Sequence, residues 1–352
     1  MKDPRVERTR YHNLNDIIFI AIAAVLSGAE SWNEIEFYGE MKNDWLKEVL
    51  ELPNGIPSHD TFNRLFSALD ADEFEKCFLN WIKSVNKITK GEVISIDGKT
   101  IRGSKKLGFK TATHIVSAWA DKNELVLGQI KVDEKSNEIT AIPKLLENLL
   151  IKDCIVTIDA MGCQKKIANK IVSKQADYIL AVKENQKELF EDIQDSFKVL
   201  KPSYTNEDID YGHGRIETRK CYVLTDLSLV EEAKKWKGLT SIIKIERERF
   251  FKATGKKETE SSFYISTLIE ASIINHGVRK HWGIENKVHW ILDVAFNEDQ
   301  SRKRAGNAAQ NFSTINRIAL NLLKNDDAKI GIKGKRKMIG WNNNYLFKVL
   351  KN

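Results

Sequence analysis

The sequence predicts an α/β protein with a mixed-sheet core, preceded by an all-helical N-terminal domain and interrupted by a β-rich insertion. Two patterns predict this class. Apolar residues recur with a helical period up to about residue 90, and beyond it strand-like runs alternate with helical segments. The length of 352 residues, with 42% hydrophobic residues, 30% charged residues and only 5 prolines, is that of an ordered chain of about two domains.

Residues 1–90 are expected to form the helical domain. A turn containing Pro and Gly at 52–57 precedes a helix whose polar side carries His59, Asp60, Asn63 and Arg64. This arrangement fits a helix-turn-helix that reads DNA, with Arg64 as a contact, and it also fits plain helical packing with a wet outer face. The expected helices cover about 14–26, 31–50, 58–69 and 70–85.

Residues 91–200 should form the first part of the core. Three strand-like runs, the first ending at Asp97, predict an antiparallel meander, and a short apolar run ending at Asp159 predicts a strand buried on both faces. The expected strands are 93–96, 114–119, 125–132, 154–158 and 178–182, and the expected helices are 139–150, 165–174 and 187–197.

The second half of the chain changes character twice. Residues 201–270 alternate like strands over 215–225, 241–251 and 262–268, which predicts the β-rich insertion. Residues 271–352 are helical again, with long helices expected over 279–294 and 308–323, and should form the helical remainder of the core with a basic C-terminal region.

Positive charge is concentrated at the C-terminal end of the sequence. Residues 301–352 hold 12 Lys and Arg against two Asp, which gives this segment a net charge of +10. Since the net charge of the whole chain is +7, the other 300 residues have a net charge of −3. This asymmetry is typical of a protein that binds a polyanion such as double-stranded DNA. A solvated basic face is the alternative.

Cysteine usage and hydropathy point to a cytoplasmic protein. The four cysteines lie far apart without a C-x-x-C pair, so they indicate neither a disulfide framework nor a zinc ribbon. The ten apolar residues at 17–26 follow a basic segment that acidic residues interrupt, and they are fewer than the roughly 20 that a membrane-spanning helix needs. We therefore expect no secretory signal and no membrane partner.

Two aspartates follow strands and are each followed closely by a glycine. If the strands that end at Asp97 and Asp159 are neighbours in the sheet, the two carboxylates face one another, and a divalent cation between them would offset their repulsion. The alternative is that each Asp caps a turn, as Asp before Gly often does.

A third carboxylate, Glu285, lies on the helix expected at 279–294. His281, Glu285 and His289 recur every four residues and should share one face, beside an apolar stripe that faces the sheet. A zinc site with His281 and His289 as ligands lacks a suitable ligand set. Glu298 and Asp299 are weaker candidates for the third carboxylate. The residues of the apolar stripe are Ile284, Val288, Ile291 and Ala295.

Eight strings of the sequence stand out in order: DGKTIRGS (97–104), HIVSAWA (114–120), KVDEKSNEITAIP (131–143), TIDAMGCQ (157–164), ADYILAVKENQ (176–186), GHGRIETR (212–219), YIST (264–267) and RKHWGIENKVHWILDVAFNED (279–299). They resemble those of the H-repeat-associated group of bacterial insertion-sequence transposases. The resemblance covers nearly the whole chain and implies a DDE transposase with a ribonuclease-H-like core and the acidic triad Asp97, Asp159 and Glu285. A clear Tyr-x2-Arg-x3-Glu-x6-Lys signature is missing, since His281 stands four positions before Glu285 and Leu292 seven after it.

The same resemblance implies cofactors and partners. The triad would hold two Mg²⁺ ions, with Mn²⁺ as a substitute, and such ions activate the attacking oxygen and stabilise the leaving one in phosphodiester cleavage. Trp282 would stack on a displaced base, and a homodimer or larger assembly would act on paired DNA ends near the bacterial nucleoid, although no heptad pattern indicates how it forms. The residues expected to bind DNA are Lys99, Arg102, Lys183, Arg279, His281, Trp282, Asn286 and Arg64.

The function expected from these patterns is Mg²⁺-dependent DNA strand cleavage followed by strand transfer of an insertion sequence. Three alternatives stay open. The protein could be a catalytically inactive relic that binds DNA, or a ribonuclease-H-like nuclease without strand transfer. A tyrosine recombinase with Tyr345 as the covalent nucleophile would leave the two strand-end aspartates without a role.

Overall fold

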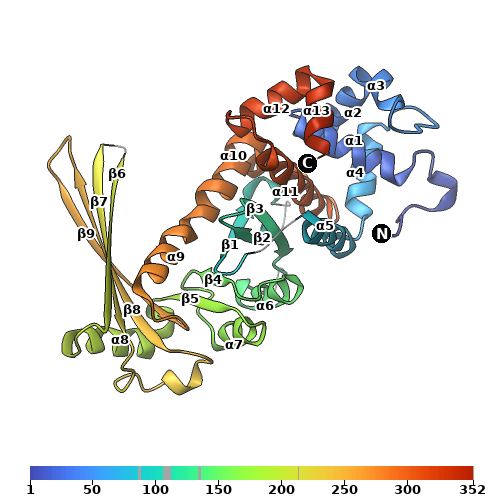
Figure 1. The fold of residues 1–352 in the computed structure, drawn as a ribbon. Coiled ribbons are helices and arrows are strands. Elements are labelled where there is room, and N and C mark those ends of the chain that lie inside the picture. The colour runs from blue at the N-terminus through green and yellow to red at the C-terminus, as the bar shows by residue number, and fades with distance from the viewer. Residues whose placement is uncertain (86–88, 106–111, 134–135, 213, 352) are drawn as a thin grey trace.

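The computed structural model describes residues 1–352 except 86–88, 106–111, 134–135, 213 and 352. The described chain is a mixed α/β structure built on one nine-stranded sheet, with strands in the order β3-β2-β1-β4-β5-β9-β8-β7-β6 (Figure 1). The α/β class and the helical N-terminal region are as predicted. The strands are β1 (Val93–Ile101), β2 (Thr113–Ala120), β3 (Leu125–Lys131), β4 (Ile155–Ile158), β5 (Asp177–Val182), β6 (Tyr204–Gly212), β7 (Arg215–Leu224), β8 (Ser241–Phe251) and β9 (Lys257–Ser266).

Strand pairing places Asp97 of β1 beside the end of β4. Strands β1, β2 and β3 form the expected antiparallel meander, whereas β1, β4 and β5 run parallel. Strand β1 does not end at Asp97, as the sequence predicted, because its antiparallel pairing with β2 continues through Lys99 opposite Ile115 to Ile101. Asp97 therefore lies just past the last residue of β1 that pairs with β4, on a stretch of β1 that is still hydrogen-bonded to β2.

The N-terminal region contains short helices that begin at side-chain caps. Ser31 and Glu34 form a capping box at the start of α2, and the Ser58 hydroxyl accepts from the Thr61 amide at the start of α4. The helix expected over 31–50 is divided in two at Lys42. The helices of this region are α1 (Leu14–Leu26), α2 (Trp32–Met41), α3 (Asn43–Lys47), α4 (His59–Ala68) and α5 (Ala71–Val85), after a 3₁₀ turn at Glu7–Thr9.

The N-terminal helices share one hydrophobic core with the C-terminal helices. Helix α11 (Ala308–Asn325) packs against α1, α4 and α5 on one side and against β2 and β3 on the other. Trp32 illustrates this continuity, since its ring stacks on Phe66 at 5.3 Å and meets the edge of Phe312 at 5.2 Å. Because the buried apolar side chains form one cluster across both regions, residues 1–90 are packed onto the α/β core.

Helix α9 (Ala271–Ile284) crosses the sheet over β1, β4 and β5 (Figure 1). Gly277 allows this close approach, because a Cβ at that position would lie 2.6 Å from Cδ1 of Ile179 in β5. Within the described residues, none of the helices has an apolar stretch long enough to cross a lipid bilayer. The remaining helices are α6 (Glu138–Asn148), α7 (Lys165–Ser173), α8 (Lys187–Val199), α10 (Trp290–Phe296), α12 (Ile332–Trp341) and α13 (Asn343–Leu350), with 3₁₀ turns at Arg102–Ser104, Glu184–Gln186, Ala233–Lys235 and Glu298–Gln300.

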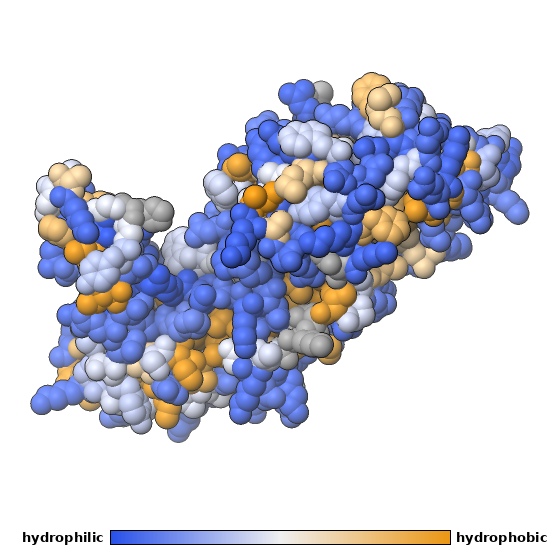
Figure 2. Space-filling model, turned by 45° about the horizontal axis from the view of Figure 1, so that its top comes forward, coloured by the Kyte–Doolittle hydropathy of each residue, from blue (hydrophilic) through white to orange (hydrophobic). Residues whose placement is uncertain are grey.

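The β-rich segment at 201–270 extends the main sheet. Its last strand, β9, pairs antiparallel with β5, and β8, β7 and β6 follow outward. The sequence missed β6, since its mostly polar, exposed residues at this edge lack apolar alternation. The outer end of this ribbon stands apart from the helices and leaves a notch between them, and hydrophilic side chains cover most of the face in Figure 2.

Candidate active site

Asp97 and Asp159 lie at the junction of β1 and β4. Ile96 is the parallel partner of Ile158, so Asp97, on β1, is the neighbour of Asp159, which directly follows β4. Asp159 Oδ1 accepts a hydrogen bond of 3.2 Å from the Gly162 amide, which turns the chain away from the sheet. The sequence predicted this meeting from the strand ends, and pairing of the two strands brings it about.

The electrostatics of this junction disfavour two unscreened negative charges. Burial, together with the neighbouring carboxylates of Asp159, Glu138 and Glu285, raises the pKa of Asp97 to about 7 against the opposing hydrogen bond from the Gly98 amide. Burial and Glu138 also raise the pKa of Asp159, while the Lys183 ammonium acts in the opposite direction. A bound cation would relieve this repulsion.

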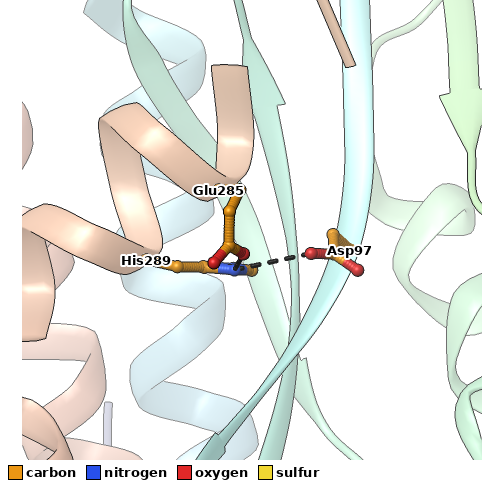
Figure 3. Close-up of side chains that lie close together, drawn as sticks. All are labelled: Asp97, Glu285 and His289. Atoms are coloured by element: carbon orange, nitrogen blue, oxygen red, sulfur yellow. Dashed lines mark hydrogen bonds and ion pairs between the residues drawn. The ribbon is translucent and has the colours of Figure 1, made fainter. Parts of the chain in front are cut away.

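A π-helical segment, Glu285–His289, joins α9 to α10 and carries the other side chains of the site (Figure 3). His289 Nδ1 lies 3.1 Å from Glu285 Oε2 and 3.5 Å from Asp97 Oδ2. One potential ligand atom from each of Asp97, Glu285 and His289 lies within 4.8 Å of the others. Single-turn π segments are frequent at functional sites, and this group is compact enough to surround one divalent cation.

His289 itself is buried, with only 5% of its side chain exposed. Burial lowers the pKa of His289 to about 3, and the positive charges of Arg317 and Lys99 contribute. The ring is therefore neutral at physiological pH.

His281 does not join the face that the sequence predicted for it. Its Nδ1 pairs with Thr157 Oγ1 in β4 at 3.1 Å, and burial lowers the pKa of His281 to about 4. Ile284 and Val288 are buried as the predicted apolar stripe requires. His281 lies toward the sheet because α9 packs across β4, whereas Glu285 and His289 lie within the π segment near β1.

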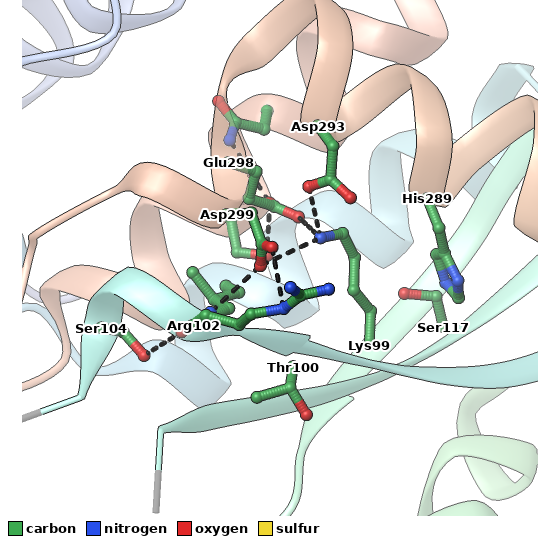
Figure 4. A network of polar contacts seen from close by, with 12 residues as sticks. Lys99, Thr100, Arg102, Ser104, Ser117, His289, Asp293, Glu298 and Asp299 are labelled. Atoms are coloured by element: carbon green, nitrogen blue, oxygen red, sulfur yellow. Dashed lines mark hydrogen bonds and ion pairs between the residues drawn. The ribbon is translucent and has the colours of Figure 1, made fainter.

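Glu298 and Asp299, the weaker candidates for the third carboxylate, belong to a separate network (Figure 4). Glu298 Oε1 accepts from Arg317 at 2.9 Å, and both side chains are buried. Asp299 pairs with Arg102 at 3.0 Å. Glu285 is thus the one of the three that lies beside Asp97.

Sequence reasoning missed Glu138 and His289 as members of this site. Glu138 lies in the first turn of α6, with Oε1 2.6 Å from His114 Nε2 in β2. It approaches β1 because Gly98 has no side chain, since a Cβ there would lie 2.1 Å from Glu138 Oε1. The sequence offered two hints of these residues: Glu138 stands at the start of an expected helix, and His289 stands four residues after Glu285. Neither hint shows that the two side chains approach β1.

The Gly98→Ala substitution should displace Glu138. The added methyl group would collide with Glu138 and His114, so we expect the pair to separate and stability to fall by about 1–3 kcal/mol. Urea unfolding measures the stability change. Gly212→Ala in β6, where a Cβ meets nothing within 4 Å, is the control and should change stability by less than about 0.5 kcal/mol. Equal effects of the two substitutions would contradict this close approach.

Comparisons with known proteins show the family to which the chain belongs. Residues 88–322 match the family described as Transposase DDE domain, and residues 1–82 match the family described as DDE_Tnp_1-associated. The chain belongs to the DDE transposase family. It is 44% identical to "Putative transposase YncI" of Escherichia coli O157:H7, over 96% of this chain and 89% of that protein.

This DDE transposase also falls within the H-repeat-associated group. It is 42% identical to "H repeat-associated putative transposase YhhI" of Escherichia coli K12, over 96% of this chain and 92% of that protein. Among solved structures, the piggyBac transposase synaptic complex with hairpin DNA aligns with 99% of this chain and 76% of that chain, at a TM-score of 0.45 and 11% identity.

Three of the residues expected to bind DNA are engaged inside the transposase. Lys99 is only 7% exposed, with Nζ 2.6 Å from Asp293 and 3.7 Å from Asp299, so it ties β1 to the segment after α9 (Figure 4). Arg279 pairs with Asp208 at 2.9 Å and also with Asp210, both in β6. His281 is the third. Because the charges of Lys99 and Arg279 are already paired with carboxylates of the protein, neither side chain is free in this structure to hold a phosphate.

The other five expected DNA contacts are at the surface. Arg102 is 84% exposed although it pairs with Asp299, and Lys183 follows β5 on the side of Asp159. Trp282 is exposed beside Arg247, whose guanidinium lies 6.0 Å from the ring centre. Asn286 and Arg64 are also exposed. These residues are available to a ligand outside the protein.

Much of the basic C-terminal region also faces inward. Four of its 12 cations are buried, and each pairs with an acidic group or a backbone carbonyl of the protein. The positive charge that a polyanion can meet is therefore smaller than the sequence suggested. The buried cations are Lys303, Arg317, Lys335 and Arg336.

Proposed function

We propose that this transposase cleaves a DNA strand at the ends of an insertion sequence and joins the freed 3′-hydroxyl to target DNA. The observation that supports the proposal is that Asp97 on β1 has two acidic neighbours, Asp159 after the paired strand β4 and Glu285 in the π segment, whose charges both act on it. These side chains come from parts of the sequence 62 and 126 residues apart, which a turn-capping role for each Asp would not require.

The core is proposed to be ribonuclease-H-like. The order β3-β2-β1-β4-β5, with three antiparallel strands followed by two parallel ones, and the succession of α6 and α7 between them support this assignment. Strands β6 to β9 are then an insertion between Asp159 and Glu285 that lengthens the same sheet.

Asp97, Asp159 and Glu285 are the residues that would hold divalent cations. Hard cations such as Mg²⁺, or Mn²⁺ in its place, prefer carboxylate oxygens, and the raised pKa of Asp97 indicates a site that lacks a compensating positive charge. When bound, two such ions would activate the attacking oxygen and stabilise the leaving oxygen of the phosphodiester. The protein's own contribution is to fix these carboxylates on a rigid strand pair and a helix.

DNA is proposed to approach along the exposed side of this site. Lys183, whose charge acts on the Asp159 carboxylate, can pair with a phosphate, and Trp282 offers an exposed ring for stacking on a base. The exposed side chains of Arg102 and Asn286 are proposed as further DNA contacts. Arg64, on α4 of the N-terminal region, is proposed to contact DNA outside the catalytic site. Two copies would be needed to hold both ends of an element, so we propose a dimer or larger assembly on DNA.

A joining assay tests this function. Purified protein is incubated with DNA that carries the inverted repeats flanking the gene and with a target plasmid, in Mg²⁺ or in EDTA. We expect nicks at the repeat ends and joined donor–target products in Mg²⁺, and neither in EDTA. Nicks without joined products would indicate a nuclease, and DNA covalently bound to denatured protein would indicate a tyrosine recombinase.

The structure gives little support to the tyrosine alternative. The Tyr345 hydroxyl donates a 2.6 Å hydrogen bond to Asp326, and burial together with this carboxylate raises the pKa of Tyr345 to about 12. A nucleophile is normally activated by a lowered pKa or by a nearby base aimed at the reacting group. Tyr345 is instead a hydrogen-bond donor within the C-terminal helices.

A further inference from the structure

We propose that the outer face of helix α12 is a second DNA-binding surface, on which Lys333 and Lys337 contact backbone phosphates of double-stranded DNA and Trp341 packs against the sugars beside them. The inference rests on the proposed function for its partner, and it adds contacts beyond those proposed around the acidic triad. It follows from the division of α12 into an inward face that anchors the helix and an outward face that carries unpaired charge.

The inward face of α12 is fixed to the protein by two buried cations. Lys335 Nζ donates a hydrogen bond of 2.9 Å to the Leu323 carbonyl. Arg336 donates to the Val25 carbonyl at 2.8 Å and also to the carbonyl of Ala295 in α10. Both charges are therefore used inside the protein, where they hold α12 in place.

The outward face of α12 carries charge that the protein does not use. Lys333, Lys337 and Trp341 follow one another at intervals of four residues, so they lie on one side of the helix, and all three are exposed. The side chain of Trp341 is 79% exposed. Among the residues that the structure describes, neither Lys333 nor Lys337 has a partner in an ion pair or a side-chain hydrogen bond.

The stability of the helix does not explain this arrangement. Like charges four residues apart on a helix repel one another, and α12 has no acidic residue in its first turn to offset Lys333. An exposed Trp side chain likewise contributes little apolar burial to the fold. Both features become favourable when a polyanion that also offers apolar sugar surface covers this face.

The position of α12 favours DNA that also occupies the active site. Arg336 attaches α12 to Ala295 of α10, and α10 continues the π segment that carries Glu285 (Figure 1). The ten residues from Glu285 to Ala295 span about 15 Å along a helix, or roughly four to five base pairs of duplex. A duplex held at the acidic triad and extending along α10 therefore reaches α12 within about one helical turn of the cleaved bond.

The salt dependence of DNA binding tests the two lysines. The full-length protein in EDTA is titrated onto a random-sequence duplex of about 40 base pairs at several salt concentrations, since backbone contacts need no particular sequence. Each phosphate contact adds about 0.9 to the slope of log affinity against log salt. Lys333→Gln/Lys337→Gln should therefore reduce the slope by about 1.8 and weaken binding by up to about 60-fold at about 0.1 M salt. An unchanged slope would overturn the inference.

Trp341 should behave differently in the same titration. Trp341→Ala removes apolar contact but no positive charge, so it should weaken binding by about 3–10-fold and leave the salt slope unchanged. Trp341→Phe keeps a flat ring and should bind more tightly than Trp341→Ala. Binding by Trp341→Ala as tight as that of the natural protein would overturn the role of Trp341.

Lys187 and Lys198 of α8 provide the matched control. Both are exposed helix lysines, and Lys187→Gln/Lys198→Gln changes the net charge by the same amount. We expect this variant to keep the natural salt slope, and an equal loss in the two double variants would show that only net charge matters. The urea midpoint of Lys333→Gln/Lys337→Gln should equal or exceed that of the natural protein, and a lower midpoint would show that these lysines serve the fold instead.

Two further outcomes separate this surface from another partner and from the proposed function. If Lys333→Gln/Lys337→Gln binds DNA normally but loses self-association in analytical ultracentrifugation, the face binds a second copy of the chain and the inference is wrong. If the natural protein shows the expected salt slopes but neither nicks nor joins DNA in Mg²⁺, the proposed cleavage is refuted while α12 remains a DNA contact.

Discussion

Asp97→Ala, Asp159→Ala and Glu285→Gln should each lower Mg²⁺-dependent nicking by about 10³-fold or more, while binding to the element's terminal repeats stays within a few-fold of the natural protein. Each substitution removes carboxylate oxygens or charge from the group that would hold the cations. Folding should survive, because Asp97 and Asp159 repel one another and removal of either relieves a cost.

A nicking assay and a gel-shift assay on the same purified variants check this prediction. Helix α8 supplies matched controls in Asp195→Ala and Glu191→Gln, two exposed carboxylates that pair with lysines on the same helix. Both controls should nick like the natural protein. A triad variant that still nicks would remove its residue from the cation site, and loss of end binding in all three would point to a general folding defect.

The metal-free protein should lose stability as the pH rises, and Asp97→Asn should remove much of that loss. The pKa of Asp97 is about 7 in the folded chain and about 3.9 in an unfolded one. Between these values the folded state holds a proton that the unfolded state has released, so the free energy of unfolding falls as the pH rises from about 4 to 7. Above pH 7 the cost is complete and reaches up to about 4 kcal/mol.

Urea unfolding in EDTA between pH 4.5 and 8 measures this effect. Asp97→Asn cannot ionise, so it should be more stable than the natural protein at pH 8, and the difference should shrink toward pH 4.5. Added Mg²⁺ at pH 8 should stabilise the natural protein far more than Asp97→Asn, because cation binding to the folded state shifts the unfolding equilibrium. Parallel pH profiles for the two proteins in EDTA would contradict the raised pKa of Asp97.

Local patterns in the sequence were sufficient to predict most of the helices and strands and to single out the carboxylates of Asp97 and Asp159. Apolar alternation and short apolar runs predicted β1 to β5, and helical periodicity predicted to within a residue where α2 and α4 begin. They failed at β6, where exposure removes the apolar alternation, and at β1, whose length depends on its partner β2. Pairing energy comes from a neighbouring strand, which local periodicity does not describe.

For the basic residues too, the sequence did not show which side chains the tertiary structure buries. Lys99 and Arg102 are three positions apart and were equally good candidates for phosphate contacts. The fold buries Lys99 among Asp293, Glu298 and Asp299 and leaves Arg102 exposed. Since the ion-pair partners of Lys99 come from nearly 200 residues away, nothing near it in the sequence could have predicted its burial.

The sequence by itself determined the α/β class, the pair of carboxylates on β1 and directly after β4, and the helical segment that carries Glu285. The tertiary structure alone decided that His289 and Glu138 meet Asp97, and that His281 turns to the sheet instead. The physical reason is that residue spacing sets which side chains share a face of one helix or strand. Which faces touch depends on how the elements pack, here through Gly98, Gly277 and the π segment.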